Sequence, residues 1–276
     1  MKNILYLILT LILGSTFSTP TLGLEGENYT KTQEDTSLAD NMMSFQYKSG
    51  SDWINYRLHS PKKTDKGERY PLVLFLHGWG ERGTDNIRHI KKAVPEMLTY
   101  AKSKQEKLYM IAPQFKENET WINGIRIDLV DSYLSPKEAS YSIKLVIKLL
   151  KEFIENNPVD TDRVYVTGLS AGGFGTWDIL VREPDLFAAA IPVAGGNAED
   201  TAEAIKHIPL WVIHGEKDDV INRNFSRRSV AALKKAGGTP VYSEFKGMTH
   251  ADPDWHFVYS NIEILDWLFS QRKIKH

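Results

Sequence analysis

The 276-residue sequence contains no cysteine. That absence excludes disulfide bonds, thiol nucleophiles and thiolate metal sites together, but it says little about the compartment, because an exported domain of this size can fold without disulfides. An excess of charge of one sign is lacking too: 34 Lys and Arg stand against 35 Asp and Glu, for a net charge of −1. A chain so balanced gives no electrostatic reason to expect nucleic acid or another polyanion as a partner.

The usual motifs for metals and nucleotides are missing as well. There is no His-x-x-x-His pair and no acidic loop of the calcium-binding type, and Pro253 between Asp252 and Asp254 indicates a turn rather than a ligand pair. The glycine cluster at 168–172 has neither a following Gly-Lys-Ser/Thr nor the G-x-G-x-x-G spacing of phosphate-binding loops. We therefore expect neither a metal nor another cofactor.

The apolar run near the N-terminus is a short one. Lys2 precedes apolar residues 4–13, and small and polar residues follow, which is the order of a secretory signal peptide. Ten residues are too few to span a bilayer, which takes about 20, so a membrane anchor is the less favoured alternative. We expect a signal peptide over 1–23, cleaved after Ser18 or Gly23, then a flexible leader over 24–41. The protein would be exported to the periplasm or the medium, without stable membrane insertion.

The rest of the chain is organised around residues 163–177, Arg-Val-Tyr-Val-Thr-Gly-Leu-Ser-Ala-Gly-Gly-Phe-Gly-Thr-Trp. The segment begins as an apolar, β-branched run typical of a buried strand and ends as the start of a helix. Between them lies a G-x-S-x-G match, a motif that holds a serine on a strained turn with its hydroxyl exposed at the edge of a sheet. Such matches also occur by chance in glycine-rich loops, but here the strand and helix supply the context that the motif requires. Ser170 is therefore the candidate nucleophile.

Apolar runs separated by polar segments predict eight strands. Two aromatic-rich segments joined by Ser-Gly-Ser-Asp predict a β-hairpin, and the other runs are typical of strands buried on both faces. Because these strands alternate with helices, we expect a mostly parallel sheet with helices on both faces, in one α/β domain over 42–276. Besides the strand that begins 163–177, the predicted strands cover 43–48, 53–60, 71–76, 108–112, 187–193, 209–213 and 239–245.

Helices are expected between these strands. Residues 86–104 have helical character that Pro95 should break or kink. Ser135 and the residues after it have the order of an N-cap, a first-turn proline and an early acid, which predicts a helix from there to about Asn156. Further helices are expected after Ser170, over 225–236 and, as a single last helix, over 256–271. Residues 116–133 show no clean period, so we expect an irregular insertion over the sheet.

A serine nucleophile needs a base, because its hydroxyl is too weak alone, and an acid group that orients the base. In a doubly wound sheet both follow later strands, in the chain order Ser, Asp or Glu, His. The loop after strand 239–245 ends in His250, which is the candidate base. The loop after strand 209–213 offers three acids, namely Glu216, Asp218 and Asp219.

Five other histidines are alternatives for the base. His77 and His214 close strands, and His256 opens the predicted last helix. His89 and His207 lie outside the loops at strand ends.

Several motifs together carry a resemblance to a known family. They are His77-Gly-Trp-Gly-Glu-Arg-Gly-Thr-Asp-Asn86, Ala112-Pro-Gln114, the segment 168–177, His214-Gly-x-x-Asp218 and Gly247-x-x-His250. From about Leu72 to the C-terminus the chain resembles the α/β-hydrolase superfamily, within it the esterases related to carboxylesterases and dienelactone hydrolases. It is similar in particular to a secreted bacterial group of "predicted peptidases" and polysaccharide esterases. The resemblance implies the α/β-hydrolase fold, with an eight-stranded, mostly parallel sheet flanked by helices.

The resemblance also implies roles for individual residues. In the pattern His-Gly-x-x-Asp-x-Val the acid is the fifth residue, Asp218, which leaves Asp219 as a turn or cap residue. The histidines that close strands, His77 and His214, are structural in this pattern. His250 then remains as the base.

Two backbone N–H groups are expected to form the oxyanion hole. One belongs to Ala171, the residue after the nucleophile, and the other to Trp79 in the loop after an earlier strand. The side chain of Trp79 either lines the acyl pocket or packs within its loop. Gln114 and Trp121 are candidate substrate-binding residues by position, and Trp121 would stack on a sugar or an aromatic ester.

These residues predict an exported serine carboxylic-ester hydrolase that works through an acyl-enzyme. The resemblance implies a small-molecule or polysaccharide-linked ester as the substrate, with acetyl or feruloyl groups. One alternative is a serine peptidase of the same fold, although such peptidases usually carry a further gating domain. Another is a non-catalytic glycan-binding module on this scaffold, although a binding role would not need serine, histidine and aspartate together.

Overall fold

The computed structural model describes residues 39–124 and 132–273. The predicted signal peptide and most of the predicted leader lie outside the described residues, as does part of the predicted insertion. No helix within the described parts of the chain combines the length and the apolar character needed to cross a bilayer.

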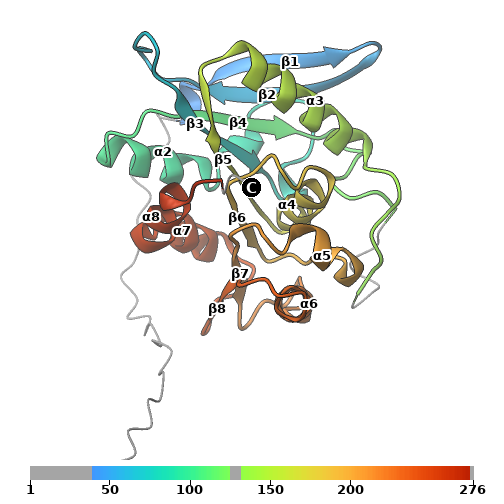
Figure 1. Ribbon diagram of the computed structural model, residues 1–276. Coiled ribbons are helices and arrows are strands. Elements are labelled where there is room, and N and C mark those ends of the chain that lie inside the picture. The colour runs from blue at the N-terminus through green and yellow to red at the C-terminus, as the bar shows by residue number, and fades with distance from the viewer. Residues whose placement is uncertain (1–38, 125–131, 274–276) are drawn as a thin grey trace, which may run out of the picture.

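The centre of the fold is a single eight-stranded sheet (Figure 1). Its strands are β1 (Met43–Ser49), β2 (Asp52–His59), β3 (Tyr70–Leu76), β4 (Tyr109–Gln114), β5 (Val159–Leu169), β6 (Ala189–Val193), β7 (Trp211–Gly215) and β8 (Val241–Phe245). They lie in the order β1-β2-β4-β3-β5-β6-β7-β8. The hairpin β1–β2 joins antiparallel to β4, and all the other pairings are parallel. The predicted number of strands and the mostly parallel sheet are thus confirmed.

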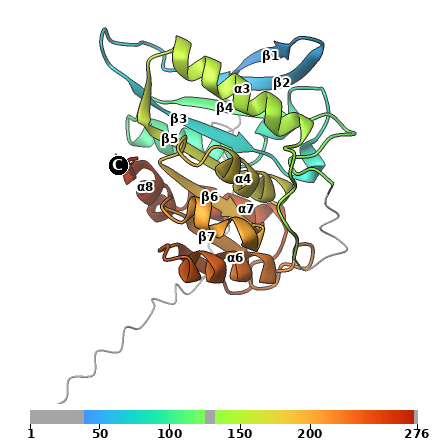
Figure 2. The same cartoon turned by 45° about the vertical axis from the view of Figure 1, so that its right-hand side comes forward.

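Helices cover both faces of the sheet. One layer contains α2 (Val94–Ser103), α7 (Asp252–Ser260) and α8 (Ile262–Ser270), and the other contains α3 (Tyr141–Asn156), α4 (Ala171–Arg182), α5 (Ala202–Ile205) and α6 (Asn224–Lys235). Three short 3-10 turns, η1 (Trp79–Glu81), η2 (Arg88–Ile90) and η3 (Glu199–Thr201), lie in the connecting loops. Figures 1 and 2 show the two helical layers on opposite sides of the sheet.

The strand β3 shows why the apolar runs carry no alternation. All seven of its residues are buried. Leu72, Leu74 and Leu76 belong to the core shared with α3 and α4, whereas Val73 and Phe75 belong to the core shared with α2, α7 and α8. Successive side chains of a strand point to opposite faces, so a strand covered on both sides must be apolar throughout.

Three helix predictions are corrected by the structure. The helix α3 begins at Tyr141 rather than near Ser135, because Ser140 is the residue that caps it. The Ser140 hydroxyl is buried, accepts a hydrogen bond from the N–H of Ile143 at 3.1 Å and donates to the carbonyl of Trp121 at 2.9 Å. One side chain thereby ties the start of the helix to the insertion, which fixes the cap at this position.

The predicted last helix is in fact two helices. Asn261 ends α7, and its side-chain oxygen accepts hydrogen bonds from the N–H groups of Glu263 and Ile264, which begin α8.

The prediction that Pro95 breaks or kinks a helix over 86–104 is wrong. Pro95 lies in the first turn of α2, where its missing N–H costs nothing, so it begins the helix instead of breaking it.

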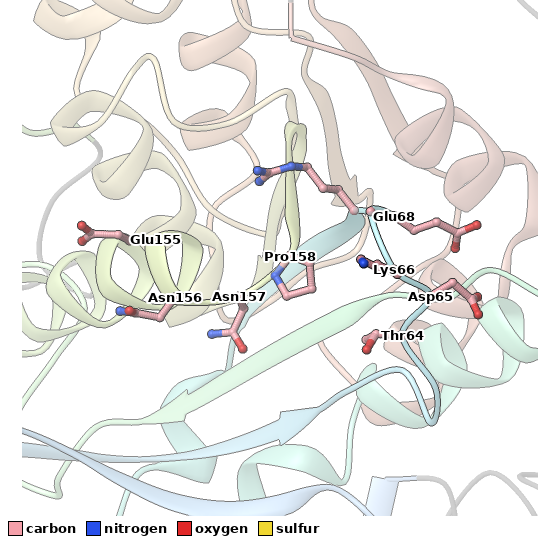
Figure 3. Close-up of a pocket in the computed structure, with 10 residues that line it drawn as sticks. Thr64, Asp65, Lys66, Glu68, Glu155, Asn156, Asn157 and Pro158 are labelled. Carbon is pink, nitrogen blue, oxygen red and sulfur yellow. The ribbon is translucent and has the colours of Figure 1, made fainter.

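A polar hollow of about 550 Å³ lies where the central strands β3 and β5 begin (Figure 3). Its lining includes Arg69, just before β3, and Pro158, just before β5, so it borders the N-terminal ends of the parallel strands. Ligand chemistry in open α/β sheets takes place at the carboxyl ends. The candidate site is therefore at the opposite ends of the strands, where β5 leads into α4.

Candidate active site

Ser170 occupies the sharp turn between β5 and α4. It follows Leu169, the last residue of the strand, and precedes Ala171, the first residue of the helix. Its φ of 55° and ψ of −119° lie in a region that residues with a Cβ rarely adopt. The turn is held in place because the N–H of Ser170 donates to the carbonyl of Val193, at the end of β6, at 2.9 Å. The strand–turn–helix context that the motif requires is present in the structure.

A histidine and an aspartate lie in line with the Ser170 hydroxyl. The Nε2 atom of His250 is 3.0 Å from Oγ of Ser170, and its Nδ1 atom is 2.8 Å from Oδ2 of Asp218. Because a carboxylate only accepts, Nδ1 carries the proton of that second bond, and Nε2 is left to accept from the serine. The loops after β5, β7 and β8 supply the three residues in the predicted order. This arrangement can take a proton from a serine hydroxyl.

Asp218 is held as an anion. Its carboxylate is buried, and Oδ1 accepts hydrogen bonds from the N–H groups of Val220 at 3.0 Å and Ile221 at 2.8 Å. Burial opposes ionisation, but the hydrogen bonds from His214, His250 and the Ile221 N–H outweigh it and hold the pKa of Asp218 well below its usual range.

The other acids in this loop are placed differently. Glu216 accepts from the N–H of Gly247 at 2.9 Å, and Asp219 is exposed. Among the three candidate acids, the structure therefore brings Asp218 to the imidazole of His250.

The loop that carries His250 is fixed by residues that sequence reasoning missed. The carboxylate of Asp254 accepts from the N–H of Thr249 at 2.8 Å and from its hydroxyl at 2.6 Å. The ring of Trp255, buried in α7, packs edge-on against the imidazole of His250 with centroids 4.9 Å apart. The spacing Thr249, His250, Asp254 is the one sequence signal that points to this brace. Within the described residues no cluster of three potential metal ligands occurs.

His77 orders the loop that follows β3. Its buried ring donates from Nδ1 to the carbonyl of Gly78 at 2.6 Å, while Nε2 accepts from the N–H of Phe115 at 3.2 Å. Burial lowers the pKa of His77 to about 4, against the opposing effects of the Gly78 carbonyl and of Asp85, so the ring is neutral near pH 7. Fixing the Gly78 carbonyl also fixes the trans peptide that carries the N–H of Trp79, one of the two predicted oxyanion donors.

The same loop lies directly against the turn that carries Ser170. A Cβ on Gly78 would stand 3.0 Å from Cδ1 of Leu169, the residue before Ser170. The other predicted donor, Ala171, begins the twelve-residue helix α4, whose first N–H groups and positive dipole end favour an anion beside them. The two predicted donors thus come from adjoining segments.

The indole of Trp79 is half exposed, at 50%, in contrast to the mostly buried aromatic residues around it. The guanidinium carbon of Arg82 lies 4.6 Å from the centroid of this ring, and its Nη1 donates to the carbonyl of Trp79 at 2.8 Å. The side chain is therefore paired within its loop and half open to solvent.

The two predicted substrate contacts, Gln114 and Trp121, are buried and bonded to protein. Gln114 accepts from the N–H of Asn86 at 2.7 Å and donates to the carbonyl of Glu81 and the carboxylate of Asp85, each at 2.9 Å. Trp121 is fully buried, and its indole N–H donates to the carbonyl of His77 at 2.9 Å. Both side chains connect the loop after β3 to neighbouring segments, and neither is open to a substrate in this structure.

The remaining histidines have partners away from Ser170. The buried ring of His89 contacts the carbonyl of Ala112 through Nε2 at 2.9 Å, and burial lowers its pKa to about 3. His256 pairs with the buried carboxylate of Glu96, and Nε2 of His207 lies 3.3 Å from the carbonyl of Pro184. His214 is buried behind Asp218, its Nε2 3.4 Å from Oδ2 of the carboxylate.

The fold and the site together define a class of protein: an α/β-hydrolase in which a serine on a strand–turn–helix elbow is hydrogen-bonded in line with a histidine and an aspartate. Residues 62–259 match the family model described as phospholipase/carboxylesterase. The chain belongs to this family.

The chain is also similar to individual proteins. Poly(3-hydroxyalkanoate) depolymerase C of Paucimonas lemoignei is 49% identical over 132 residues, which make up 46% of this chain and 28% of that protein. A bifunctional acetylxylan esterase/xylanase of Neocallimastix patriciarum is 30% identical over 86 residues, 31% of this chain and 12% of that protein. The crystal structure of a thermostable esterase superposes with a TM-score of 0.75 at 35% identity, covering 86% of this chain and 64% of that one. The chain thus matches less than a third of the length of either curated relative.

Proposed function

We propose that the protein is an exported serine carboxylic-ester hydrolase that uses Ser170 as nucleophile, His250 as base and Asp218 as the acid that orients the base. The observation that carries the proposal is the continuous hydrogen-bonded line from Oγ of Ser170 through His250 to Asp218, at 3.0 and 2.8 Å. A buried, ionised aspartate at its end both fixes the tautomer of the imidazole and stabilises the imidazolium that forms.

In the first half of the reaction Oγ of Ser170 attacks the ester carbonyl while Nε2 of His250 takes the hydroxyl proton. The N–H groups of Ala171 and Trp79 donate to the tetrahedral oxyanion. The imidazolium then gives its proton to the leaving alcohol, and an acyl-enzyme remains on Ser170. Water, deprotonated by His250, attacks this ester in the second half, and the acid is released as Ser170 recovers its proton.

For the substrate we propose esters attached to carbohydrates, with acetyl or feruloyl groups. The resemblance to polysaccharide esterases and the similarity to an acetylxylan esterase/xylanase support this class. The half-exposed indole of Trp79, in the loop whose Gly78 packs against Leu169, gives a sugar or an aromatic acyl group a surface to pack against. Similarity to a poly(3-hydroxyalkanoate) depolymerase makes an aliphatic polyester the second candidate.

Export remains part of the proposal and depends on the signal-like residues 1–23. It is tested by expressing the full chain in a bacterial host, fractionating the cells and determining the N-terminus of the exported form by mass spectrometry. Cleavage after Ser18 or Gly23 is the expected result. Retention of the intact chain in the membrane fraction would favour an anchor instead.

The catalytic proposal is tested by comparing the wild type with Ser170→Ala and with Ser270→Ala, a control at an exposed serine on α8. Hydrolysis of p-nitrophenyl acetate and butyrate should fall by several orders of magnitude for Ser170→Ala alone. A fluorescent phosphonate should label the wild type and the control but not Ser170→Ala. Equal activity in all three proteins would rule out Ser170 as the nucleophile. The kcat/KM values for acetylated xylan, methyl ferulate and a 3-hydroxybutyrate oligomer then rank the substrate classes.

A serine peptidase remains the alternative reaction, because the same three residues also cleave amides. Parallel assays with p-nitroanilide peptides decide between the two. A kcat/KM for peptide anilides above that for esters would transfer the assignment to the peptidase. Binding to glycans without turnover of either substrate would instead favour the binding module.

A further inference from the structure

His214 is a buried histidine to which the proposed reaction gives no task. It lies in β7, its side chain is fully buried, and its ring is directly behind the carboxylate of Asp218. Nε2 is 2.9 Å from the carbonyl oxygen of Ile221 and 3.4 Å from Oδ2 of Asp218. Both of these oxygens only accept, so Nε2 carries a hydrogen that is directed between them.

The Ile221 peptide connects His214 to the other oxygen of the same carboxylate. Its N–H donates to Oδ1 of Asp218 at 2.8 Å, while its carbonyl accepts from His214. His214 therefore acts on Asp218 by two routes, directly at Oδ2 and through the Ile221 peptide at Oδ1. Since Oδ2 is also the oxygen that accepts from His250, a small rotation of the carboxylate would change the direction of the bond to the base.

The far side of the ring is anchored as well. Nδ1 is 2.7 Å from the hydroxyl oxygen of Ser226 in α6, and the same oxygen is 2.7 Å from the carbonyl oxygen of Gly195. Both side chains are fully buried. Gly195 in turn packs against Gly173 of the nucleophile helix, since a Cβ on Gly195 would stand 2.6 Å from the carbonyl carbon of Gly173. A buried chain of contacts thus runs from the acid of the triad to the helix behind its nucleophile.

We propose that His214 is a positioning residue for the reaction, which holds the Asp218 carboxylate in the orientation that His250 needs. The inference rests on the proposed function, because it assumes that Asp218 is the working acid. If the ring only filled space, a buried apolar side chain would serve as well, because no hydrogen-bond donor would be needed at this place in the sheet. The geometry assigns a task to the donor itself, in addition to the packing of the ring.

Other charged groups near this loop are more exposed. Glu216, Asp219 and Arg223 line an open hollow of about 420 Å³ on the outer side of the loop, and Arg223 donates to the backbone carbonyl of Glu216. From α7, Asp254 is engaged by Thr249. In the interior His214 and His250 are the two side chains that bond the Asp218 carboxylate, and both lower the pKa of Asp218 against the effect of burial.

The test compares His214→Phe, which keeps a planar ring and removes the donor, with His214→Gln, which places an amide N–H near the position of Nε2. In the phenylalanine variant we expect kcat for p-nitrophenyl acetate to fall about 10- to 100-fold with KM within about 3-fold, the scale of a slightly misplaced catalytic group. The acidic limb of its kcat–pH profile should shift, because this limb reports protonation of the base, and the carboxylate that pairs with the base has lost a donor. The glutamine variant should recover most of the wild-type kcat and most of the wild-type pH profile.

A purely structural role would give a different pattern. His214→Phe would then lower the unfolding temperature but leave kcat per folded molecule and the pH profile unchanged, which overturns the inference. Should His214→Phe not fold, Ser226→Ala, which releases the far side of the ring, must give a smaller loss of kcat in the same sense. Unchanged kcat there overturns it as well.

Titration with a phosphonate counts the competent sites in each variant, and Ser170→Ala is included in the same series. Activity that persists in Ser170→Ala would contradict the proposed function itself. Loss in Ser170→Ala together with wild-type behaviour of both His214 variants would contradict only the role of His214.

Discussion

The backbone of Gly172 lies directly against the carbonyl of Leu76, so that a Cβ at residue 172 would overlap the Leu76 oxygen. This contact brings the first turn of α4 onto the end of β3, the strand that leads into the loop of Trp79. The nucleophile turn and the predicted oxyanion loop are therefore in register through a contact of backbone with backbone. The second glycine of the G-x-S-x-G motif has a steric reason here that does not involve a positive φ.

Replacing Gly172 with alanine should move these two segments apart. We expect Gly172→Ala to destabilise the protein by about 1–3 kcal/mol, as overpacking of a close contact does, and to lower kcat/KM at least 100-fold. Chemical denaturation and ester hydrolysis measure the two effects. The control is Gly80→Ala, where a Cβ meets open space, and its stability should match the wild type. Equal activity of Gly172→Ala would show that the contact is not needed for alignment.

The neighbouring aspartates at 218 and 219 allow a matched comparison. Asp218→Asn keeps the size of the side chain but reverses the tautomer preference of His250, so kcat should fall about 10³- to 10⁴-fold, the scale known for the aspartate of serine protease triads. Asp219→Asn, at an exposed position, should stay within a few-fold of the wild type. Steady-state kinetics on p-nitrophenyl acetate measures both. The reverse ranking would move the acid to Asp219.

A substitution at Gln114 distinguishes a structural role of this side chain from contact with the substrate. Gln114→Leu keeps the volume but leaves the N–H of Asn86 and the carbonyl of Glu81 without this partner. We expect a loss of about 1–3 kcal/mol in the free energy of unfolding, the cost of buried polar groups that lose a hydrogen bond. KM should change little. A large rise in KM at unchanged stability would restore Gln114 as a substrate-binding residue.

The buried pair His77 and His89 makes stability depend on pH. Their pKa values are about 4 and about 3 in the folded protein, whereas a histidine in the unfolded chain takes up its proton near pH 6.5. The unfolded state therefore binds more protons as the pH falls below 6.5. The stability that these neutral rings contribute should be fully present above pH 6.5. It should decrease below that, down to about pH 4 for His77 and about pH 3 for His89, by up to about 1.4 kcal/mol per pH unit for each histidine.

Urea denaturation between pH 4 and 8 measures this dependence. His89→Asn removes one of the two groups, so its acid limb should be less steep, whereas substitution of the exposed His207 should leave the slope unchanged. A slope as steep in His89→Asn as in the wild type would contradict this origin.

The sequence predicts the elements of this fold better than their ends. Strands buried on both faces are visible as unbroken apolar runs, and the strand–turn–helix around Ser170 is visible because one motif imposes it. The start of α3 is hidden, because both Ser135 and Ser140 have the chemistry of a cap, and only the contact of Ser140 with Trp121 decides between them. Asn261 is hidden in a similar way within an apolar pattern that continues on both sides of it.

The candidate site shows the same division. Chain order and strand ends predict that Ser170, Asp218 and His250 meet, because parallel strands end at one edge of the sheet. The burial of Gln114 depends on how the loop after β3 folds over it, which no local pattern records. The brace that Asp254 and Trp255 give to His250 also depends on the angle at which α7 leaves the loop.

The backbone contact between Gly172 and Leu76 affects how enzymes of this family can diverge. Because Ser170 is located by main-chain atoms of β3, β5 and α4, side chains in the surrounding loops can change without moving it. The side chain of Trp79, half exposed and paired within its own loop, is one that could change in this way. A scaffold of this kind separates the reaction from the choice of ester, so new acyl and alcohol groups become accessible to selection while the catalytic geometry is inherited unchanged.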